Sequence, residues 1–291
     1  MILSIVILSY NTLDLVLEAV ESLRNQYRKE LEEKQIEIIV VDNASEKKVV
    51  DRIERGLSGR SGVTLIKNDE NLGFGKGCNL GTKHSKAEFV LFLNSDTNTH
   101  DRGFLGMADF LKRNPKVAIA GGRLLNLDGS KQNSVGKFYN LLNLAITLFG
   151  GGKIGLLSSS PDQAKKVDWV TGACMMVSKN IFEKIGGFDK DFFMYMEDME
   201  LCYRAKKEGY DTYYYPKVSV IHKEQGSSNR GFAIVNIYKG ILLFYKKHKS
   251  KLEYNIVRRF LWLKAGAVYL LGRLTNNSYY INTYKETLKI L

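Results

Sequence analysis

The stretch that decides the fold is Phe89-Val90-Leu91-Phe92-Leu93-Asn94-Ser95-Asp96-Thr97, an apolar run that ends in a short polar segment. The apolar residues are too few and too β-prone for a helix, so they predict a buried strand. In an open α/β sheet, ligands bind just beyond the carboxyl ends of strands, and Asp96 lies at such an end. A lone carboxylate among small polar groups suits a hard cation with an anionic ligand. A polar turn without a ligand is the alternative interpretation.

Short apolar runs alternate with helical patterns through the first 120 residues of the 291-residue chain. Such alternation is typical of βαβ units, so we predict an α/β fold with a mixed, mostly parallel central sheet flanked by helices. The predicted strands are Leu3–Leu8, Ile36–Val41, Val63–Ile66, Phe89–Leu93 and Val117–Ala120, and the helical patterns between them cover 12–28, 46–57, 75–85 and 101–113.

Polar side chains follow four of these strands, at 9–11, 42–45, 68–71 and 94–96. Because parallel strands bring their carboxyl ends to one edge of a sheet, we expect these segments to meet there. Four polar strand ends at one edge define a candidate site.

The second half of the chain predicts more strands and a helical C-terminal extension. A Gly/Ser-rich stretch at 150–161 is typical of a mobile loop. We expect strands at 167–177, 212–215 and 218–222, and helices at 179–185, 197–207, 232–250 and 253–274.

Composition indicates one large or two small domains with an ample core, since 44% of the residues are hydrophobic. Cys78, Cys174 and Cys202 are far apart and form no CxxC pair, which argues against a disulfide framework or a structural zinc site. We expect them to be small buried hydrophobes in a reducing compartment.

Residues 1–8 have no basic leader and are too short to span a bilayer, so they predict a first strand.

The net charge of +12 is concentrated at the C-terminus, because residues 239–291 hold 11 Lys and Arg against 2 Asp and Glu. Such a tail suits nucleic acid or an anionic membrane, and a solvated basic helix is the alternative. The apolar run 260–271 is interrupted by Lys264 and flanked by arginines, a pattern that predicts an interfacial membrane helix. A core helix packed on the main domain is equally compatible with it.

The glycine-rich segment Asn71–Gly81 resembles a phosphate-binding loop but meets neither familiar pattern. The third glycine of GxGxxG would fall on Cys78 or Leu80, and no Lys-Ser or Lys-Thr pair follows. What remains is a glycine-rich start of a helix, whose free N–H groups can face an anion.

Glu197-Asp198-Met199-Glu200 places three carboxylates at the start of a predicted helix. Compensation of the helix dipole is one explanation. The bulky apolar residues 192–196 before them suggest instead a partly desolvated cleft, where a raised carboxyl pKa suits a general base. His222 alone reads as structural, but beside Asp96 it would complete a metal site.

Eight segments in this order resemble a family 2 glycosyltransferase of the GT-A fold, in the rhamnosyltransferase-like branch that builds bacterial and archaeal surface polysaccharides. They span residues 1 to about 230 and are Ser9-Tyr10-Asn11, Val41–Ser45, Asn71–Gly81, Leu93–Thr97, Thr171–Cys174, Gly187-Phe188-Asp189, Phe192–Arg204, and His222 with Gly226–Ser228.

The resemblance implies roles for individual residues. Asp42 would hydrogen-bond a pyrimidine base, and Asp96 and His222 would hold Mg²⁺ or Mn²⁺ on the donor diphosphate. Asn94 stands where the family's DxD motif has its first Asp, which removes one charge from the metal site. Asp198 would be the catalytic base, with Glu197 as its acidic neighbour. The other implied nucleotide-binding residues are Ser9, Asn11, Asn71, Gly75, Asn79, Asn94 and Ser95, and the implied acceptor and sugar pocket is Trp169, Thr171, Gly172 and Ala173.

The resemblance also implies an organisation and partners. Residues 1–230 would form the catalytic domain, with a nucleotide-binding half (1–120) and an acceptor-binding half (121–230), and 231–291 a basic helical extension. The activity would be inverting transfer of a sugar, with rhamnose as the candidate, from a UDP- or dTDP-linked donor. The acceptor would be a glycan or polyprenyl-linked hydroxyl. We expect a peripheral position on the cytoplasmic face of the membrane, and no nucleic-acid partner.

Two other functions fit a nucleotide-binding α/β sheet. A nucleotidyltransferase that makes the sugar nucleotide would need a Gly-rich, basic triphosphate loop near the N-terminus, which this chain lacks. A binding scaffold without catalysis is less compatible with the presence of both Asp198 and His222.

Overall fold

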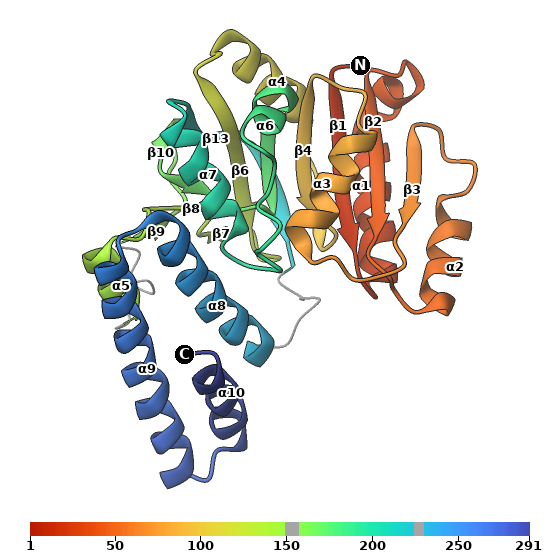
Figure 1. Cartoon of the computed structure of the whole chain (residues 1–291). Coiled ribbons are helices and arrows are strands. Elements are labelled where there is room, and N and C mark those ends of the chain that lie inside the picture. Colours follow the sequence, from red (N-terminus) through yellow and green to blue (C-terminus); the bar gives the residue numbers. More distant parts are fainter. Residues whose placement is uncertain (149–156, 224–229) are drawn as a thin grey trace.

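The computed structural model describes residues 1–148, 157–223 and 230–291, and its centre is a large twisted sheet (Figure 1). Within these residues the sheet has ten strands, in the order β10-β13-β6-β12-β4-β1-β2-β3, with β5 beside β13 and β7 beside β6. Its strands are β1 (Leu3–Ser9), β2 (Ile36–Asp42), β3 (Val63–Lys67), β4 (Phe89–Asn94), β5 (Thr97–Thr99), β6 (Val117–Leu125), β7 (Lys131–Gln132), β10 (Lys165–Val167), β12 (Cys174–Ser178) and β13 (Asp211–His222).

The predicted parallel half of the sheet is confirmed. Strand β1 pairs in parallel with both β2 and β4, and β2 pairs in parallel with β3. These strands are apolar almost throughout because helices cover both faces of the sheet. Helices α1 (Leu13–Glu32), α2 (Lys47–Leu57) and α4 (Phe104–Arg113) pack on one face, and α3 (Phe74–His84), α6 (Lys179–Lys184) and α7 (Glu197–Lys207) on the other.

Two of the predicted strand assignments are wrong. The run 167–177 is not one strand, because the chain leaves the main sheet after β10 and returns only at β12. Between them β11 (Trp169–Val170) joins a small second sheet with β8 (Val135–Gly136) and β9 (Ser158–Ser159). Conversely, the two strands predicted at 212–215 and 218–222 form the single strand β13. Its register with β6 shifts between Tyr214 and Ser219, the stretch that contains Pro216.

The three cysteines are buried and unpaired, as predicted. Burial raises the pKa of the Cys174 and Cys202 thiols to about 12. Residues 150–156 of the predicted Gly/Ser-rich loop, and the Gly226–Ser228 segment, lie outside the described residues.

The C-terminal extension contains three helices, one more than predicted: α8 (Arg230–His248), α9 (Lys251–Leu274) and α10 (Ser278–Lys289). The side chain of Asn277 accepts a hydrogen bond from the Tyr280 N–H and so caps α10. A hydrophobic core joins these helices to the segment before α7 and to the short helix α5 (Leu141–Leu148). Figure 1 shows the extension on one side of the sheet, with α8 nearest to it.

Ion pairs fasten α8 to the rest of the molecule. Lys247 contacts Asp189 and Asp191, each at 2.6 Å. His248 Nε2 lies 2.9 Å from Oε1 of Glu200, a carboxylate that is fully buried. The extension therefore has fixed contacts with the segment that carries the predicted catalytic residues.

Helix α9 has two distinct sides. Val257, Leu261 and Ala265 are buried in the core that it shares with its neighbours. Large apolar side chains spaced mostly three, four or seven residues apart are exposed on another side, and these are Leu252, Phe260, Leu263, Leu270, Leu271 and Leu274. No helix in the described parts of the chain is both long enough and apolar enough to cross a bilayer.

Candidate active site

A cleft of about 940 Å³ lies where the carboxyl ends of β1, β2 and β4 meet the start of α7. The site predicted at this sheet edge is therefore present as a cavity. Most of the predicted site residues line it, namely Asn71, Asn94, Ser95, Asp96, Trp169, Thr171, Gly172, Ala173, Glu197, Asp198 and His222.

Asp96 and His222 are brought together by the antiparallel pairing of β5 with β13, in which His222 lies opposite Thr97. The Lys223 N–H donates to the Asp96 carbonyl oxygen (3.0 Å) and fixes the end of this pairing. As a result His222 Nε2 lies 3.3 Å from Asp96 Oδ1, and Asp96 is only 9% exposed.

Gln132 orients the imidazole ring of His222. Its amide N–H groups donate to the carbonyl oxygen of His222 (2.7 Å) and to Asn126 Oδ1 (2.6 Å), so its Oε1 accepts from His222 Nδ1 (2.9 Å). Nδ1 therefore carries the proton of the ring. The lone pair of Nε2 points toward Asp96 Oδ1 and Asn94 Nδ2, each at 3.3 Å. Gln132 has the position of an outer-shell residue that orients a metal-ligating histidine.

This donor set fits a divalent cation such as Mg²⁺ or Mn²⁺. A carboxylate oxygen and an imidazole lone pair face each other, with the ring held by a hydrogen bond on its far side. The described residues contain no group of three or more His, Cys, Asp or Glu side chains arranged for a metal. A cation here would take its remaining ligands from phosphate oxygens and water, which is how Mg²⁺ is commonly bound.

Asp198 and Glu197 occupy the first turn of α7. Asp198 Oδ2 accepts from the Gly172 N–H (3.1 Å), and its Oδ1 accepts from the Met199 N–H (2.7 Å). Burial raises the pKa of Asp198 above its ordinary value despite these hydrogen bonds. Glu197 is 5% exposed with an unpaired Oε2, and burial, together with the charge of Asp198, raises its pKa well above the usual range. Asp198 accepts two backbone hydrogen bonds that favour its charged form, whereas Oε2 of Glu197 has no partner among the described residues, so Asp198 is the carboxylate better suited to be ionised.

A strained turn places these carboxylates. Tyr195 and Met196, just before α7, both have left-handed backbones, with φ of 68° and 72°. Gly73 packs directly against this segment, because a Cβ on Gly73 would lie 2.2 Å from the Phe193 carbonyl oxygen. The same oxygen accepts a hydrogen bond from the Phe74 N–H. The glycine at the start of α3 thus lets the segment before α7 approach this helix closely.

The remaining predicted nucleotide residues are not among those that line the described cleft, and their side chains have other contacts. Ser9 Oγ lies 3.0 Å from Thr12 Oγ1, and the carboxylate of Asp42 accepts from the Ser45 hydroxyl (2.6 Å) and N–H (3.0 Å). Asn11 Oδ1 accepts from the Glu46 N–H at 2.9 Å. Their roles in nucleotide binding stay predictions.

Asn79 and Gly75 support the loop that precedes α7. The amide of Asn79 donates to the Phe188 carbonyl oxygen (2.8 Å) and accepts from its N–H (2.9 Å). A Cβ on Gly75 would lie 2.9 Å from Phe188 Cβ. The structure thus shows packing contacts for both residues, and their contact with a nucleotide stays a prediction.

Several cleft residues were given no individual role from the sequence, among them Tyr10, Asn43, Tyr139 and Arg230. Asn43 is buried and binds Asn71 Oδ1 (2.8 Å), Asn68 and the Leu72 N–H, so it organises the loop after β3. Its position in the polar segment 42–45 at a strand end was a usable signal. Nothing local in the sequence marks Tyr139 or Arg230.

Comparison with known families identifies the protein's class. The family model described as Glycosyl transferase family 2 matches residues 4–186, and the model described as N-terminal domain of galactosyltransferase matches residues 157–225. Since the first match covers more than half of the chain, the protein belongs to glycosyl transferase family 2.

Curated relatives point the same way. The low-salt glycan biosynthesis hexosyltransferase Agl10 of Haloferax volcanii is 30% identical over 209 residues, which are 69% of this chain and 64% of that protein. The N-acetylglucosaminyl-diphospho-decaprenol L-rhamnosyltransferase of Mycobacterium tuberculosis is 27% identical, over 58% of this chain and 61% of its own length. Rhamnosyltransferase WbbL of Escherichia coli is 28% identical, over 55% and 64%. The chain spans a little under two thirds of the length of these relatives.

Solved structures confirm the predicted GT-A fold. GalNAc-T7 with UDP, GalNAc and Mn²⁺ aligns with a TM-score of 0.62 and 14% identity, covering 83% of this chain and 47% of that one. The mannosyltransferase PcManGT of Pyrobaculum calidifontis, with GDP-Man and Mn²⁺, aligns with a TM-score of 0.59 and 15% identity, covering 99% and 74%. At these identities the likeness concerns the fold alone.

The close approach at Gly73 gives a prediction for stability. Gly73 and Gly129 have nearly the same positive φ, 77° and 79°, but nothing lies within 4 Å of a Cβ on Gly129. Gly129→Ala should cost about 1–2 kcal/mol, the usual cost of a left-handed backbone. Gly73→Ala should cost clearly more, because its φ of 77° and ψ of 179° form a combination open essentially to glycine alone and because the new methyl group meets the Phe193 carbonyl. Urea denaturation measures both, and equal losses would contradict the packing role of Gly73.

Proposed function

We propose that the protein is an inverting glycosyltransferase that moves a sugar from a nucleoside diphosphate to an acceptor hydroxyl. The observation that carries this proposal is that a buried carboxylate pair, Glu197 and Asp198, lines the same cleft as the Asp96–His222 pair. One pair suits proton removal, and the other suits the diphosphate of the donor through a divalent cation. Membership of glycosyl transferase family 2 supports the same reaction class.

The reaction follows from what these side chains do. The carboxylate of Asp198 takes the proton of the acceptor hydroxyl, whose oxygen forms a bond to the anomeric carbon. The bond from that carbon to the phosphate oxygen breaks, and the nucleoside diphosphate leaves on the opposite side. A single displacement inverts the anomeric centre, and the Gly172 N–H keeps Asp198 oriented. A bound cation would supply Lewis-acid stabilisation of the leaving diphosphate.

We further propose a UDP- or dTDP-linked donor, with rhamnose as the candidate sugar, and a polyprenyl-linked acceptor. The names of two relatives support this choice, since one is a rhamnosyltransferase acting on N-acetylglucosaminyl-diphospho-decaprenol and another is a rhamnosyltransferase. The hexosyltransferase of Haloferax volcanii supports transfer in glycan biosynthesis more generally.

We also propose that α9 rests on an anionic membrane surface. Its exposed apolar stripe runs from Leu252 to Leu274, and Leu274 is 86% exposed. Arg258, Arg259 and Arg273 lie on the same helix, in a region where 11 basic residues face 2 acidic ones. An apolar stripe with flanking basic side chains is the pattern of a helix that lies in the headgroup layer.

The catalytic assignment gives a first prediction. Asp198→Asn should lower turnover by about 10²–10⁴-fold, the usual contribution of a general base, while binding of the nucleotide changes little. Glu197→Gln should keep most of the turnover, because Glu197 is the neutral partner of the pair. Steady-state kinetics and calorimetry measure the two effects, and near-normal turnover of Asp198→Asn would remove Asp198 as the base.

The same assignment predicts a pH dependence. The base must be ionised, so kcat/KM should fall as the pH drops through the pKa of Asp198. Because burial raises that pKa, the acidic limb should lie above pH ~3.9, the value of an unperturbed Asp. A pH profile of kcat/KM checks this, and a profile that stays flat down to pH ~4 would contradict it.

The cation site gives a third prediction. Gln132→Leu leaves both ligands but frees the His222 ring, and it should weaken Mn²⁺-dependent binding of UDP by about 10–100-fold. Asp96→Ala should weaken it further. Calorimetry with and without Mn²⁺ measures this, with Asp51→Ala, an exposed carboxylate of α2, as control. Unchanged Mn²⁺-dependent binding in Asp96→Ala would exclude its role as a ligand.

The membrane proposal is tested with the full chain. Leu263→Asp with Leu270→Asp should reduce co-sedimentation with phosphatidylserine vesicles, because both side chains are exposed on the apolar stripe of α9. Leu127→Asp, which changes an equally exposed leucine far along the sequence, should sediment like the unaltered protein. Equal pelleting of the α9 variant and the control would show that this stripe is not the contact surface.

A further inference from the structure

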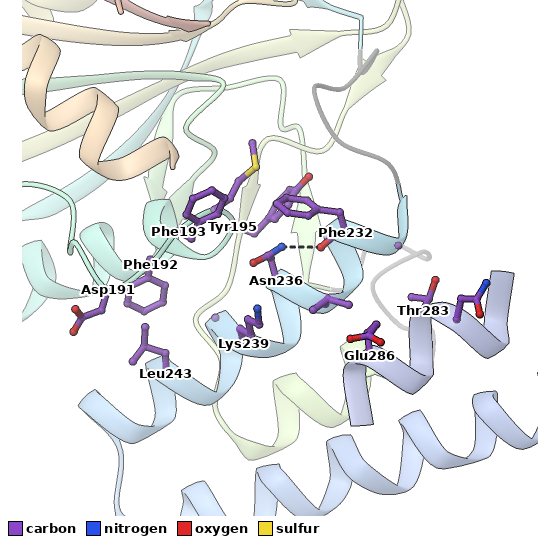
Figure 2. Close-up of a pocket in the computed structure, with 15 residues that line it drawn as sticks. Asp191, Phe192, Phe193, Tyr195, Phe232, Asn236, Lys239, Leu243, Thr283 and Glu286 are labelled. Carbon is purple, nitrogen blue, oxygen red and sulfur yellow. Dashed lines mark hydrogen bonds between the residues drawn. The ribbon is translucent and has the colours of Figure 1, made fainter. Parts of the chain in front are cut away.

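A second cavity, of about 770 Å³, lies next to the catalytic cleft and is not used by the mechanism above (Figure 2). One side of α8 forms its floor, the segment 191–195 before α7 forms one wall, and α10 forms another. We call it the α8 groove. Apart from the wall at 191–195, it is built from the C-terminal extension, which lies beyond the residues that the two family models match, 4–186 and 157–225.

The α8 groove is elongated and mostly apolar inside. Its floor residues recur at intervals of about four, from Gly231 through Val235 to Leu243, and so follow one side of the helix for about 18 Å. Phe193 packs edge-on against Phe232 at one end, with ring centroids 6.3 Å apart. The buried amide of Asn236 donates to the Phe232 carbonyl oxygen (2.9 Å), so this polar group is satisfied within the helix (Figure 2).

The α8 groove borders the catalytic cleft. Phe193, Met194, Tyr195 and Phe232 line both cavities. The segment that they share leads within a few residues to Glu197 and Asp198. The α8 groove is thus the neighbouring cavity for the rest of a molecule whose hydroxyl reaches Asp198.

The charges around the α8 groove favour an anionic amphiphile. Asp191 is paired with Lys247, and Glu286 is paired with Lys289, both at 2.6–2.7 Å. Lys239 is exposed, lines the groove and has no ion pair with any described residue. Its ammonium group is thus available to a phosphate, while the apolar floor suits a hydrocarbon chain.

We propose that the α8 groove binds the first isoprene units of the polyprenyl phosphate that carries the acceptor sugar. This inference rests on the proposed lipid-linked acceptor and deepens it by naming where the lipid lies. The groove directs the chain away from the catalytic carboxylates and along the extension that bears the apolar stripe of α9. The extension then serves two purposes, since α9 contacts the membrane and α8 receives a lipid drawn from it.

Binding of a fluorescent farnesyl phosphate to the full chain, without donor or detergent, tests this. Val235→Asp and Leu243→Asp should raise its Kd at least tenfold, and Lys239→Glu should do so for farnesyl phosphate but not for farnesol. Val50→Asp, a half-buried valine of α2, is the matched control and should leave the Kd unchanged. Val235→Trp, which fills the groove with an apolar group, covers the case in which a buried aspartate unfolds the protein.

The outcomes are separable. Equal Kd values for the wild type, Val235→Asp and Val235→Trp, or no binding at all, would overturn the proposal. A change from dimer to monomer in Val235→Asp by sedimentation would assign the groove to a second copy of the chain and also overturn it. Because binding is measured without donor, it does not depend on the base assignment, and Asp198→Asn should bind the lipid normally. Failure of the glycosyltransferase proposal would appear in turnover and nucleotide binding instead.

Discussion

The fully buried carboxylate of Glu200 is the contact on which the arrangement of the site depends. It accepts two hydrogen bonds from Arg204, each at 2.7 Å, and lies 2.9 Å from His248 on α8. Arg204 in turn donates to the carbonyl oxygens of Ile185 and Gly187. One buried charge therefore joins helix α7, the turn after α6 and the C-terminal extension. Removing one partner of such a group would leave an uncompensated charge, which is strongly destabilising.

The cleft combines two chemical environments, one around Asp198 and Glu197 and one around Asp96 and His222. Asp198 and Glu197 lie where burial raises carboxyl pKa values, which suits the removal of a proton from a hydroxyl. Asp96 and His222 lie where a hydrogen-bonded imidazole and a carboxylate converge, which favours a cation. The close packing of Gly73 against the segment before α7 brings the two environments to one cavity. The C-terminal helices form the α8 groove beside that cavity.

Local patterns in the sequence predicted the parallel half of the sheet well, because buried strands such as β4 are continuous apolar runs with polar residues at their ends. They failed where pairing partners decide the structure. Residues 167–177 are apolar enough for one strand, yet Trp169 pairs with Gly136 in a separate sheet. Helix α10 was missed because its tyrosine, threonine and asparagine residues have low helix propensity, and contacts with α8 and α9 stabilise it.

The sequence by itself determined the position of Asp96 at the end of a buried strand, the acidic start of α7 and the basic character of the C-terminus, because each depends only on neighbouring residues. Only the tertiary structure decided that His222, 128 residues after Asn94, lies beside it with its ring oriented by Gln132. The same holds for the strained Tyr195–Met196 turn and the groove along α8. These features depend on strand register and on close packing between distant segments. Local periodicity in the sequence indicates neither the register nor the packing.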